Sequence, residues 1–105
     1  MKIIWEPAAK LSLREIARYI NNRFGKNSVK EFRHKVSEQE AILLSFPDIG
    51  APDPLFHDRT ITYRSVLIYG LSKMVYYIKG DTIRVAAFWD NRQDPNNQAS
   101  QVESF

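Results

Sequence analysis

The stretch that decides the fold begins at Tyr63, ends at Trp89 and reads YRSVLIYGLSKMVYYIKGDTIRVAAFW. Polar and apolar side chains alternate through most of it, and this alternation is the period of a β-strand. Gly70 and the Gly80–Asp81 pair interrupt the stretch at two places where tight turns fit. Such short turns predict an antiparallel meander of three strands. The strands are expected at residues 60–69, 73–79 and 83–89.

Residues 8–24 follow the helical period instead. Leu13, Ile16 and Ile20 recur at intervals of three and four residues, which places them on one face of a helix. Gly25 comes next and favours the left-handed backbone with which many helices end. We therefore predict an α-helix from residue 8 to residue 24.

A second helix is predicted between Ser28 and Pro47. Ser28 and Glu31 match the capping box, in which each side chain accepts a hydrogen bond from the other residue's backbone N–H. Pro47 ends the helix because it has no N–H to continue it. Only residues 25–27 separate the two helices, so we expect an antiparallel hairpin. Apolar residues at helical spacing within this segment are Val29, Phe32, Val36 and Leu43.

The remaining segments complete the expected fold. Residues 2–5 form a short apolar run closed by Pro7, which fits a brief strand, and residues 47–54 hold three of the five prolines and fit a loop. The sequence therefore predicts an α+β fold of order β-α-α-β-β-β. The helical hairpin should cover one face of a small, mainly antiparallel sheet, with the first strand at an edge or beside a central strand. The other face should stay open and carry the functional residues.

Length and composition restrict the class of protein. A chain of 105 residues suits one domain, which we place at residues 1–95, followed by a polar and mobile tail at residues 96–105. The sequence has no cysteine, no zinc-binding or phosphate-binding motif and no long apolar run. We therefore expect a soluble, cytoplasmic protein that binds no metal, no cofactor and no membrane.

The formal net charge of +3 hides a segregation along the chain. Residues 10–35 carry eight basic and two acidic side chains, whereas residues 36–58 carry five acidic side chains and no lysine or arginine. Residues 59–92 return to six basic against two acidic side chains. A basic face of this kind fits an acidic protein or a nucleic acid, and for residues 10–35 a solvated helix surface fits at least as well.

Five short segments share their order with the parts of one known protein family. The segments are residues 5–9 (WEPAA), 46–50 (FPDIG), 63–65 (YRS), 74–78 (MVYYI) and 90–95 (DNRQDP). Each is a weak signal alone, but all five fall on the expected elements, and together they span roughly residues 3–95. The chain therefore resembles the RelE/ParE toxin superfamily.

This resemblance implies the toxin of a type II toxin–antitoxin module, of the plasmid stabilisation type, that a cognate antitoxin protein holds inactive. RelE-like members cut messenger RNA in the ribosomal A site. ParE-like members poison DNA gyrase without known nuclease chemistry. The two branches therefore predict two different targets, the ribosome with its mRNA or DNA gyrase.

The nuclease branch makes a specific prediction about cationic residues. Metal-free RNA cleavage requires a base, cations beside the phosphorane and an acid for the leaving oxygen. The resemblance places Lys73 where the family has an arginine on the second strand of the meander, and Arg92 where it has an arginine after the last strand. If the chain is a nuclease, we expect Lys73, Arg92 and Arg64 to be catalytic and to converge on the open face. Together with Arg84, they are the expected nucleic-acid-binding residues.

The C-terminal part departs from the nuclease pattern. No tyrosine or histidine follows Arg92, and Asp90 stands where many relatives have a histidine. An aspartate there can act as a base, but it also repels phosphate. We therefore prefer a ParE-like inhibitor of DNA gyrase. The alternatives are a RelE-like, ribosome-dependent mRNA endoribonuclease and a non-toxic nucleic-acid-binding regulatory domain.

Other polar residues have structural explanations. His34 lies between two basic residues in the second predicted helix and is expected at the surface. His57 follows a loop and is a weaker candidate for the rim of the site. Tyr76 and Tyr77 are neighbours on a strand, so one should lie in the core and the other should face a partner.

Overall fold

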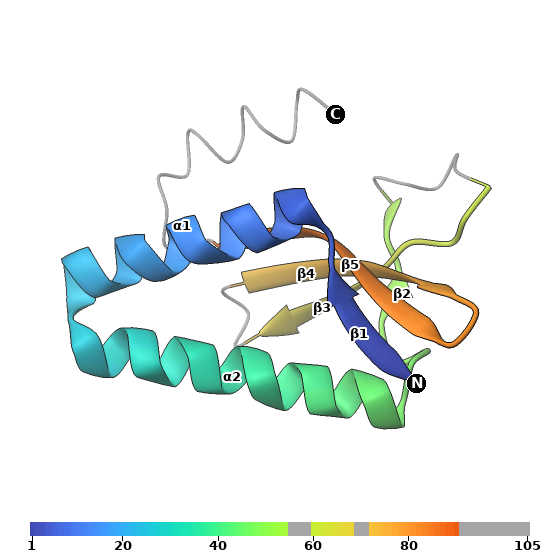
Figure 1. Ribbon diagram of the computed structural model, residues 1–105, viewed down its shortest axis with the longest axis horizontal. Helices are drawn as coiled ribbons and strands as arrows, with labels where there is room; N and C mark the ends of the chain where they lie inside the picture. Colours follow the sequence, from blue (N-terminus) through green and yellow to red (C-terminus); the bar gives the residue numbers. More distant parts are fainter. Residues whose placement is uncertain (55–59, 69–71, 91–105) are drawn as a thin grey trace.

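A computed structural model describes residues 1–54, 60–68 and 72–90 of the chain (Figure 1). The fold is α+β as predicted, with one strand more than expected. The elements are β1 (Lys2–Trp5), α1 (Pro7–Phe24), α2 (Lys26–Ser45), β2 (Ala51–Pro52), β3 (Arg64–Ile68), β4 (Ser72–Lys79) and β5 (Thr82–Asp90). The expected tail at residues 96–105, the turn at residues 70–71, His57 and Arg92 lie outside the described residues.

The five strands form one mixed sheet in the order β1-β5-β4-β3-β2. Strand β1 takes an edge position and pairs in parallel with β5, with Ile3 opposite Ile83. Strands β3, β4 and β5 form the predicted antiparallel meander. Gly80, with a φ of 61°, lies in the tight turn between β4 and β5, where its lack of a Cβ permits this backbone.

The extra strand lies in the segment that the prolines assigned to a loop. Ala51 and Pro52 form β2, which pairs in antiparallel register with β3 and places Pro52 opposite Arg64. Proline is tolerated there because β2 is an edge strand and proline lacks only the N–H. The prediction of a loop over all of residues 47–54 was therefore wrong at these two residues.

The second helix begins two residues before the predicted capping box. Helix α2 starts at Lys26, and no side chain caps it. The Ser28 hydroxyl instead donates to the Phe24 carbonyl at 3.3 Å. The capping-box prediction was wrong because Gly25, at a φ of 95°, both ends α1 and caps the start of α2. Helix α2 therefore begins directly after Gly25 and already includes Ser28. Neither described helix is both long enough and apolar enough to span a membrane.

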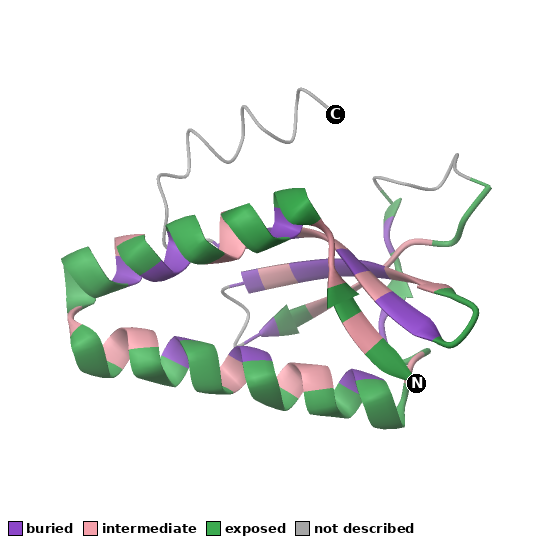
Figure 2. Cartoon of the chain, in the orientation of Figure 1, coloured by how far each residue is buried: buried purple, intermediate pink, exposed green. Residues whose placement is uncertain are grey.

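The two helices form the predicted antiparallel hairpin, which covers one face of the sheet (Figure 1). Figure 2 shows the buried positions of both helices on the sides that face each other and the sheet. Phe88 of β5 joins three elements, because its ring centroid lies 5.6 Å from that of Trp5 and 6.0 Å from that of Phe32. The core around it includes Ile16, Ile20, Leu43, Met74, Tyr76, Ile83 and Val85.

The side chains of β4 alternate between the two faces of the sheet. Met74 and Tyr76 lie in the core with the helices, whereas Lys73, Val75 and Tyr77 lie on what we call the second face. The prediction that one of the two adjacent tyrosines is buried and the other is not is confirmed. The second face is less open than expected, because Val75 has an exposed fraction of 0%.

This assignment of faces predicts the cost of two substitutions. Phe88→Ala should lower the free energy of unfolding by about 3–5 kcal/mol, because it removes a buried ring at the centre of the core. Leu67→Ala is the control, since Leu67 is 65% exposed on the second face, and it should change stability by at most about 0.5 kcal/mol. Urea denaturation followed by circular dichroism measures both. Similar losses in the two variants would contradict the assignment.

Candidate functional site

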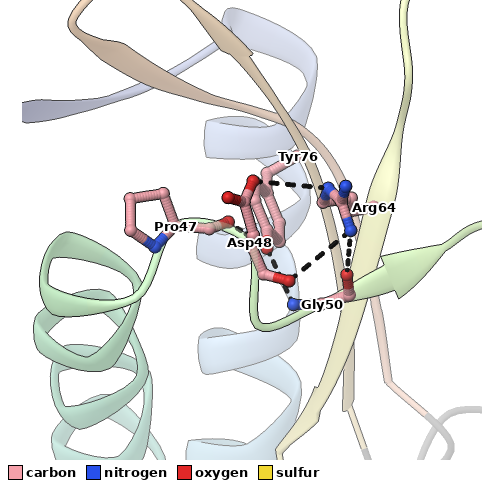
Figure 3. A network of polar contacts seen from close by, with 5 residues as sticks. All are labelled: Pro47, Asp48, Gly50, Arg64 and Tyr76. Atoms are coloured by element: carbon pink, nitrogen blue, oxygen red, sulfur yellow. Dashed lines mark hydrogen bonds and ion pairs between the residues drawn. The ribbon is translucent and has the colours of Figure 1, made fainter.

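Tyr76 and Arg64 hold the loop that follows α2 (Figure 3). The Tyr76 hydroxyl donates to the Pro47 carbonyl at 2.7 Å and accepts the Gly50 N–H at 3.0 Å. Arg64 Nη1 donates to the Gly50 carbonyl at 2.8 Å, and Arg64 Nε lies 3.9 Å from an Asp48 carboxylate oxygen. Burial raises the pKa of the Tyr76 hydroxyl, which therefore keeps its proton at neutral pH. These contacts fix the path of the chain from α2 into β2.

Gly50 lies where no side chain fits. A Cβ at this position would lie 2.8 Å from the Tyr76 hydroxyl oxygen and 2.9 Å from the Ser65 carbonyl oxygen. Neither neighbour can withdraw freely, because Ser65 belongs to the β3 backbone and the Tyr76 ring is fully buried. The loop therefore approaches the sheet more closely than a larger residue would allow.

Lys73 binds a carboxylate on the second face. Its Nζ lies 2.7 Å from Asp53 Oδ2, and the Asp53 side chain has an exposed fraction of 0%. Asp53 directly follows β2, and its N–H donates to the Tyr63 carbonyl at 2.8 Å. Lys73 Nζ also lies 5.4 Å from the centroid of the Trp89 ring, within the range of a cation–π contact. The charge of Lys73 is thus matched by a buried partner inside the chain.

A second polar group on this face joins Glu6, which follows β1, to β4 and β5. The Tyr77 hydroxyl donates to Glu6 Oε2 at 2.7 Å, and Arg84 Nε donates to the same oxygen at 3.2 Å. The hydrogen bond to Glu6 raises the pKa of both the Tyr77 hydroxyl and the Arg84 guanidinium. The rings of Tyr63 and Tyr77 meet edge to face, with centroids 5.2 Å apart. Arg84, like Lys73, is therefore paired with a carboxylate.

The candidate acid–base residues are placed away from any open site. Asp90 has an exposed fraction of 0% and accepts a hydrogen bond from Ser72 Oγ at 2.6 Å. His34 is exposed on α2, and its Nε2 lies 2.8 Å from Glu38, which confirms the expected surface position. Among the described residues, no group of three histidine, aspartate or glutamate side chains is arranged to hold a metal ion.

The structure does not bring Arg64 and Lys73 together. Arg64 lies opposite Tyr76 in the β3–β4 register, whereas Lys73 lies opposite Leu67. Successive positions on a strand point to opposite faces, and Arg64 and Leu67 are three positions apart on β3, so the two cations leave the sheet on opposite sides. The expected convergence of these two residues was therefore wrong. Lys73 and Arg84 do share the second face.

Sequence reasoning did not identify Asp53 and Glu6 as partners of these cations. Glu6 lies 78 positions before Arg84, and Asp53 lies in a segment assigned to a loop. The available signal was that each acid immediately follows a strand, at the end of β1 and at the end of β2. That signal becomes usable only when the sheet order is known.

The fold and these surfaces define a small α+β protein in which a helical hairpin covers a meander and a parallel edge strand. Residues 3–95 match the family model described as ParE toxin of type II toxin-antitoxin system, parDE. The chain therefore belongs to the family of ParE toxins. No curated protein sequence matches it.

Two solved structures resemble this chain. The first belongs to the chromosomal ParDE TA system from P. aeruginosa, with 18% sequence identity and a TM-score of 0.68, over 86% of this chain and 95% of that one. This match shows a shared fold. The second is the conserved hypothetical protein HP0894 from Helicobacter pylori, with 15% identity and a TM-score of 0.42, over 88% of this chain and 96% of that one.

The Tyr76 network predicts a pH dependence of stability. Above the ordinary tyrosine pKa of 10.0, the unfolded chain loses the Tyr76 proton while the folded chain retains it, so stability should fall as pH rises. Tyr76→Phe should lower the free energy of unfolding at pH 7 by about 1–3 kcal/mol, because the Gly50 N–H loses its acceptor. Urea denaturation at neutral and alkaline pH should show a shallower alkaline decline in this variant. Equal slopes in both proteins would exclude the predicted effect.

The Lys73–Asp53 pair predicts a coupling between two substitutions. Lys73→Met leaves the buried Asp53 carboxylate without its cation and should cost about 1–3 kcal/mol. This is below the cost of breaking a fully buried pair, because the Lys73 side chain is 28% exposed. Adding Asp53→Asn should recover most of the loss, and a double-mutant cycle from urea denaturation measures this coupling. A coupling of zero would show that the pair contributes nothing to stability.

Proposed function

We propose that this ParE-family toxin is neutralised by a cognate antitoxin and that it inhibits DNA gyrase by binding rather than by cutting RNA. The proposal combines the family with the placement of the polar residues. The observation that carries it is the pairing of the cations of the second face with carboxylates of the same chain, Lys73 with Asp53 and Arg84 with Glu6.

This pairing bears directly on RNA cleavage. Cations that stabilise a phosphorane need donors aimed at the position where the negative charge develops. Lys73 is held by a buried carboxylate, Arg84 by Glu6, and Arg64 lies on the opposite face of the sheet against the loop after α2. A nuclease built from the described cations would have to break these contacts before it could bind the phosphate.

The candidate proton-transfer groups also argue against RNA cleavage. Asp90 is buried against Ser72 and has no exposed surface. The Tyr77 hydroxyl donates to Glu6, and its raised pKa keeps it protonated at neutral pH, so that it has no free anion to act as a base. The described candidates therefore do not supply the acid and base that cleavage requires. Arg92 lies outside the described residues, and its part in a nuclease stays a prediction.

The surface at the end of α2 supports the proposal that the chain acts by binding another protein. A hollow of about 570 Å³ is lined by Ser45, Phe46, Pro47, Asp48 and Ile49. Phe46 is 65% exposed and Ile49 is 54% exposed, although both are large and apolar. Exposed apolar groups that gather at one place are typical of protein interfaces. The Tyr76 network holds this loop in place before any partner binds.

Induced expression in bacterial cells separates the candidate functions. Thymidine and methionine incorporation are followed in parallel after induction without antitoxin, together with a reporter of DNA damage. A gyrase inhibitor should stop thymidine incorporation first and induce the damage response, and co-expression of the antitoxin should prevent both effects. If methionine incorporation stops first and mRNA is cut, the chain is an endoribonuclease. If neither changes, the chain is inactive or is not a toxin, and tight RNA or DNA binding with a steep salt dependence would then favour the non-toxic nucleic-acid-binding domain.

A further inference from the structure

The turn that follows α2 exposes two large apolar side chains on one hollow. Phe46 is 65% exposed and Ile49 is 54% exposed. The Ile49 N–H donates to the Phe46 carbonyl at 3.1 Å and closes a tight turn. Such a turn holds its first and fourth residues within about 7 Å of each other. The two side chains therefore belong to one surface, the α2-end hollow, which is lined by Ser45, Phe46, Pro47, Asp48 and Ile49.

The backbone beneath the α2-end hollow is held in place from both sides. The Phe46 N–H donates to the Ile42 carbonyl at 2.8 Å, so the last turn of α2 supports the start of the loop. At the other side, the Tyr76 hydroxyl binds the Pro47 carbonyl and the Gly50 N–H (Figure 3). A surface that is fixed before binding loses little conformational entropy when a partner docks. The hollow is therefore prepared to bind without rearrangement.

One acidic side chain borders this apolar surface. Asp48 is 81% exposed, and its carboxylate lies 3.9 Å from Arg64 Nε, whereas Arg64 Nη1 donates to the Gly50 carbonyl. The Asp48 carboxylate is therefore open to a second cation. Residues 36–58 contain no lysine or arginine, so this segment adds no positive charge around the hollow. An apolar side chain flanked by lysine or arginine matches such a surface.

Two other occupants match the α2-end hollow less well. A nucleic acid is bound chiefly by lysine and arginine, and its phosphates would be repelled by the Asp48 carboxylate. A second copy of the chain, docked through the same hollow by twofold symmetry, would bring two Asp48 carboxylates into one interface. A different protein with a cation beside an apolar side chain meets neither obstacle.

The α2-end hollow is separate from the groove of the helical hairpin, and its charge is opposite. A recess in that groove, with a volume of about 310 Å³, is lined in part by Arg14, Arg18 and Arg33. Among the described residues, none of these three arginines forms an ion pair. At a rise of 1.5 Å per residue, Arg33 and Ser45 are about 18 Å apart along α2. The two surfaces therefore suit partners of opposite charge.

We propose that the toxin binds DNA gyrase through the α2-end hollow, which takes an apolar side chain of gyrase flanked by a lysine or an arginine. Phe46 and Ile49 supply the apolar contact, and the carboxylate of Asp48 binds the flanking cation. The inference rests on the proposed function and adds to it the surface of the toxin that meets the target.

The apolar contact is tested by surface plasmon resonance on immobilised, purified DNA gyrase. The hollow variant combines Phe46→Ser and Ile49→Ser. The control variant combines Leu67→Ser and Leu11→Ser, whose side chains have the same exposed fractions of 65% and 54% on β3 and α1. The hollow variant should bind gyrase at least about tenfold more weakly than the unsubstituted chain, and the control should stay within about twofold. Equal losses in the two variants would overturn the proposal.

The charged contact is tested with Asp48→Asn, because asparagine is well tolerated in turns. Its control is Glu15→Gln, which removes one exposed negative charge from α1. Asp48→Asn should weaken gyrase binding about threefold at low salt, and this difference should shrink as salt rises, because exposed ion pairs are screened. The loss in the hollow variant should persist at high salt. An effect of Asp48→Asn no larger than that of Glu15→Gln would exclude the cationic partner side chain and overturn the proposal.

Thermal unfolding checks that the variants are folded. Each should melt within about 4 °C of the unsubstituted chain, because the substituted side chains are exposed. If the hollow variant is less stable than this, Phe46→Ser alone replaces it with Leu67→Ser as its control, and the same order of binding is expected.

The remaining outcomes separate this inference from the proposed function. Gyrase binding that does not depend on the α2-end hollow would overturn the inference alone. Absence of gyrase binding by the unsubstituted chain would overturn the proposed function and the inference together. A dimer of the unsubstituted chain in sedimentation that the hollow variant dissociates would assign the hollow to a second copy and overturn the inference.

Discussion

The buried hydroxyl of Tyr76 links the central strand β4 to the chain as it leaves the helical hairpin. It binds the Pro47 carbonyl and the Gly50 N–H, and Arg64 binds the Gly50 carbonyl from the neighbouring strand. These contacts set the path into β2, the edge strand that pairs with β3. Because Asp53 directly follows β2, the same path places a buried carboxylate against Lys73 on the second face. The Tyr76 hydroxyl on one face of β4 thus helps to position the carboxylate that pairs with Lys73 on the other face.

This arrangement divides the basic residues of the chain into two groups. Arg64, Lys73 and Arg84 bind carbonyls or carboxylates of the same molecule and help to hold the sheet together. The arginines in the groove of the hairpin have no such described partner and repel one another. The first group therefore contributes to the fold, and the second is available to an external anion. A net charge of +3 does not reveal this division, because it counts both groups alike.

Periodicity was sufficient to predict the order of the elements and the separation of Tyr76 from Tyr77. It could not reveal β2, because a strand of two residues that includes Pro52 has no period to detect. The Ser28–Glu31 pattern placed the start of α2 too late, because this pattern is local. Gly25, at positive φ, ends α1 and lets α2 begin at once. The faces of Arg64 and Lys73 depend on the register of two strands, and the carboxylates that bind Lys73 and Arg84 come from distant segments. Such partners follow from tertiary structure, which local patterns do not encode.

Membership of the ParE toxins together with internally paired cations supports the proposal that this toxin acts by binding its target. The most direct measurement is DNA supercoiling by purified gyrase in the presence of the chain and of its Lys73→Met/Asp53→Asn double variant. Both proteins should inhibit supercoiling to a similar degree, because the double variant removes the ion pair as a unit and leaves the rest of the fold in place. Unchanged gyrase activity, together with ribosome-dependent mRNA cleavage that the double variant abolishes, would contradict this mode of action.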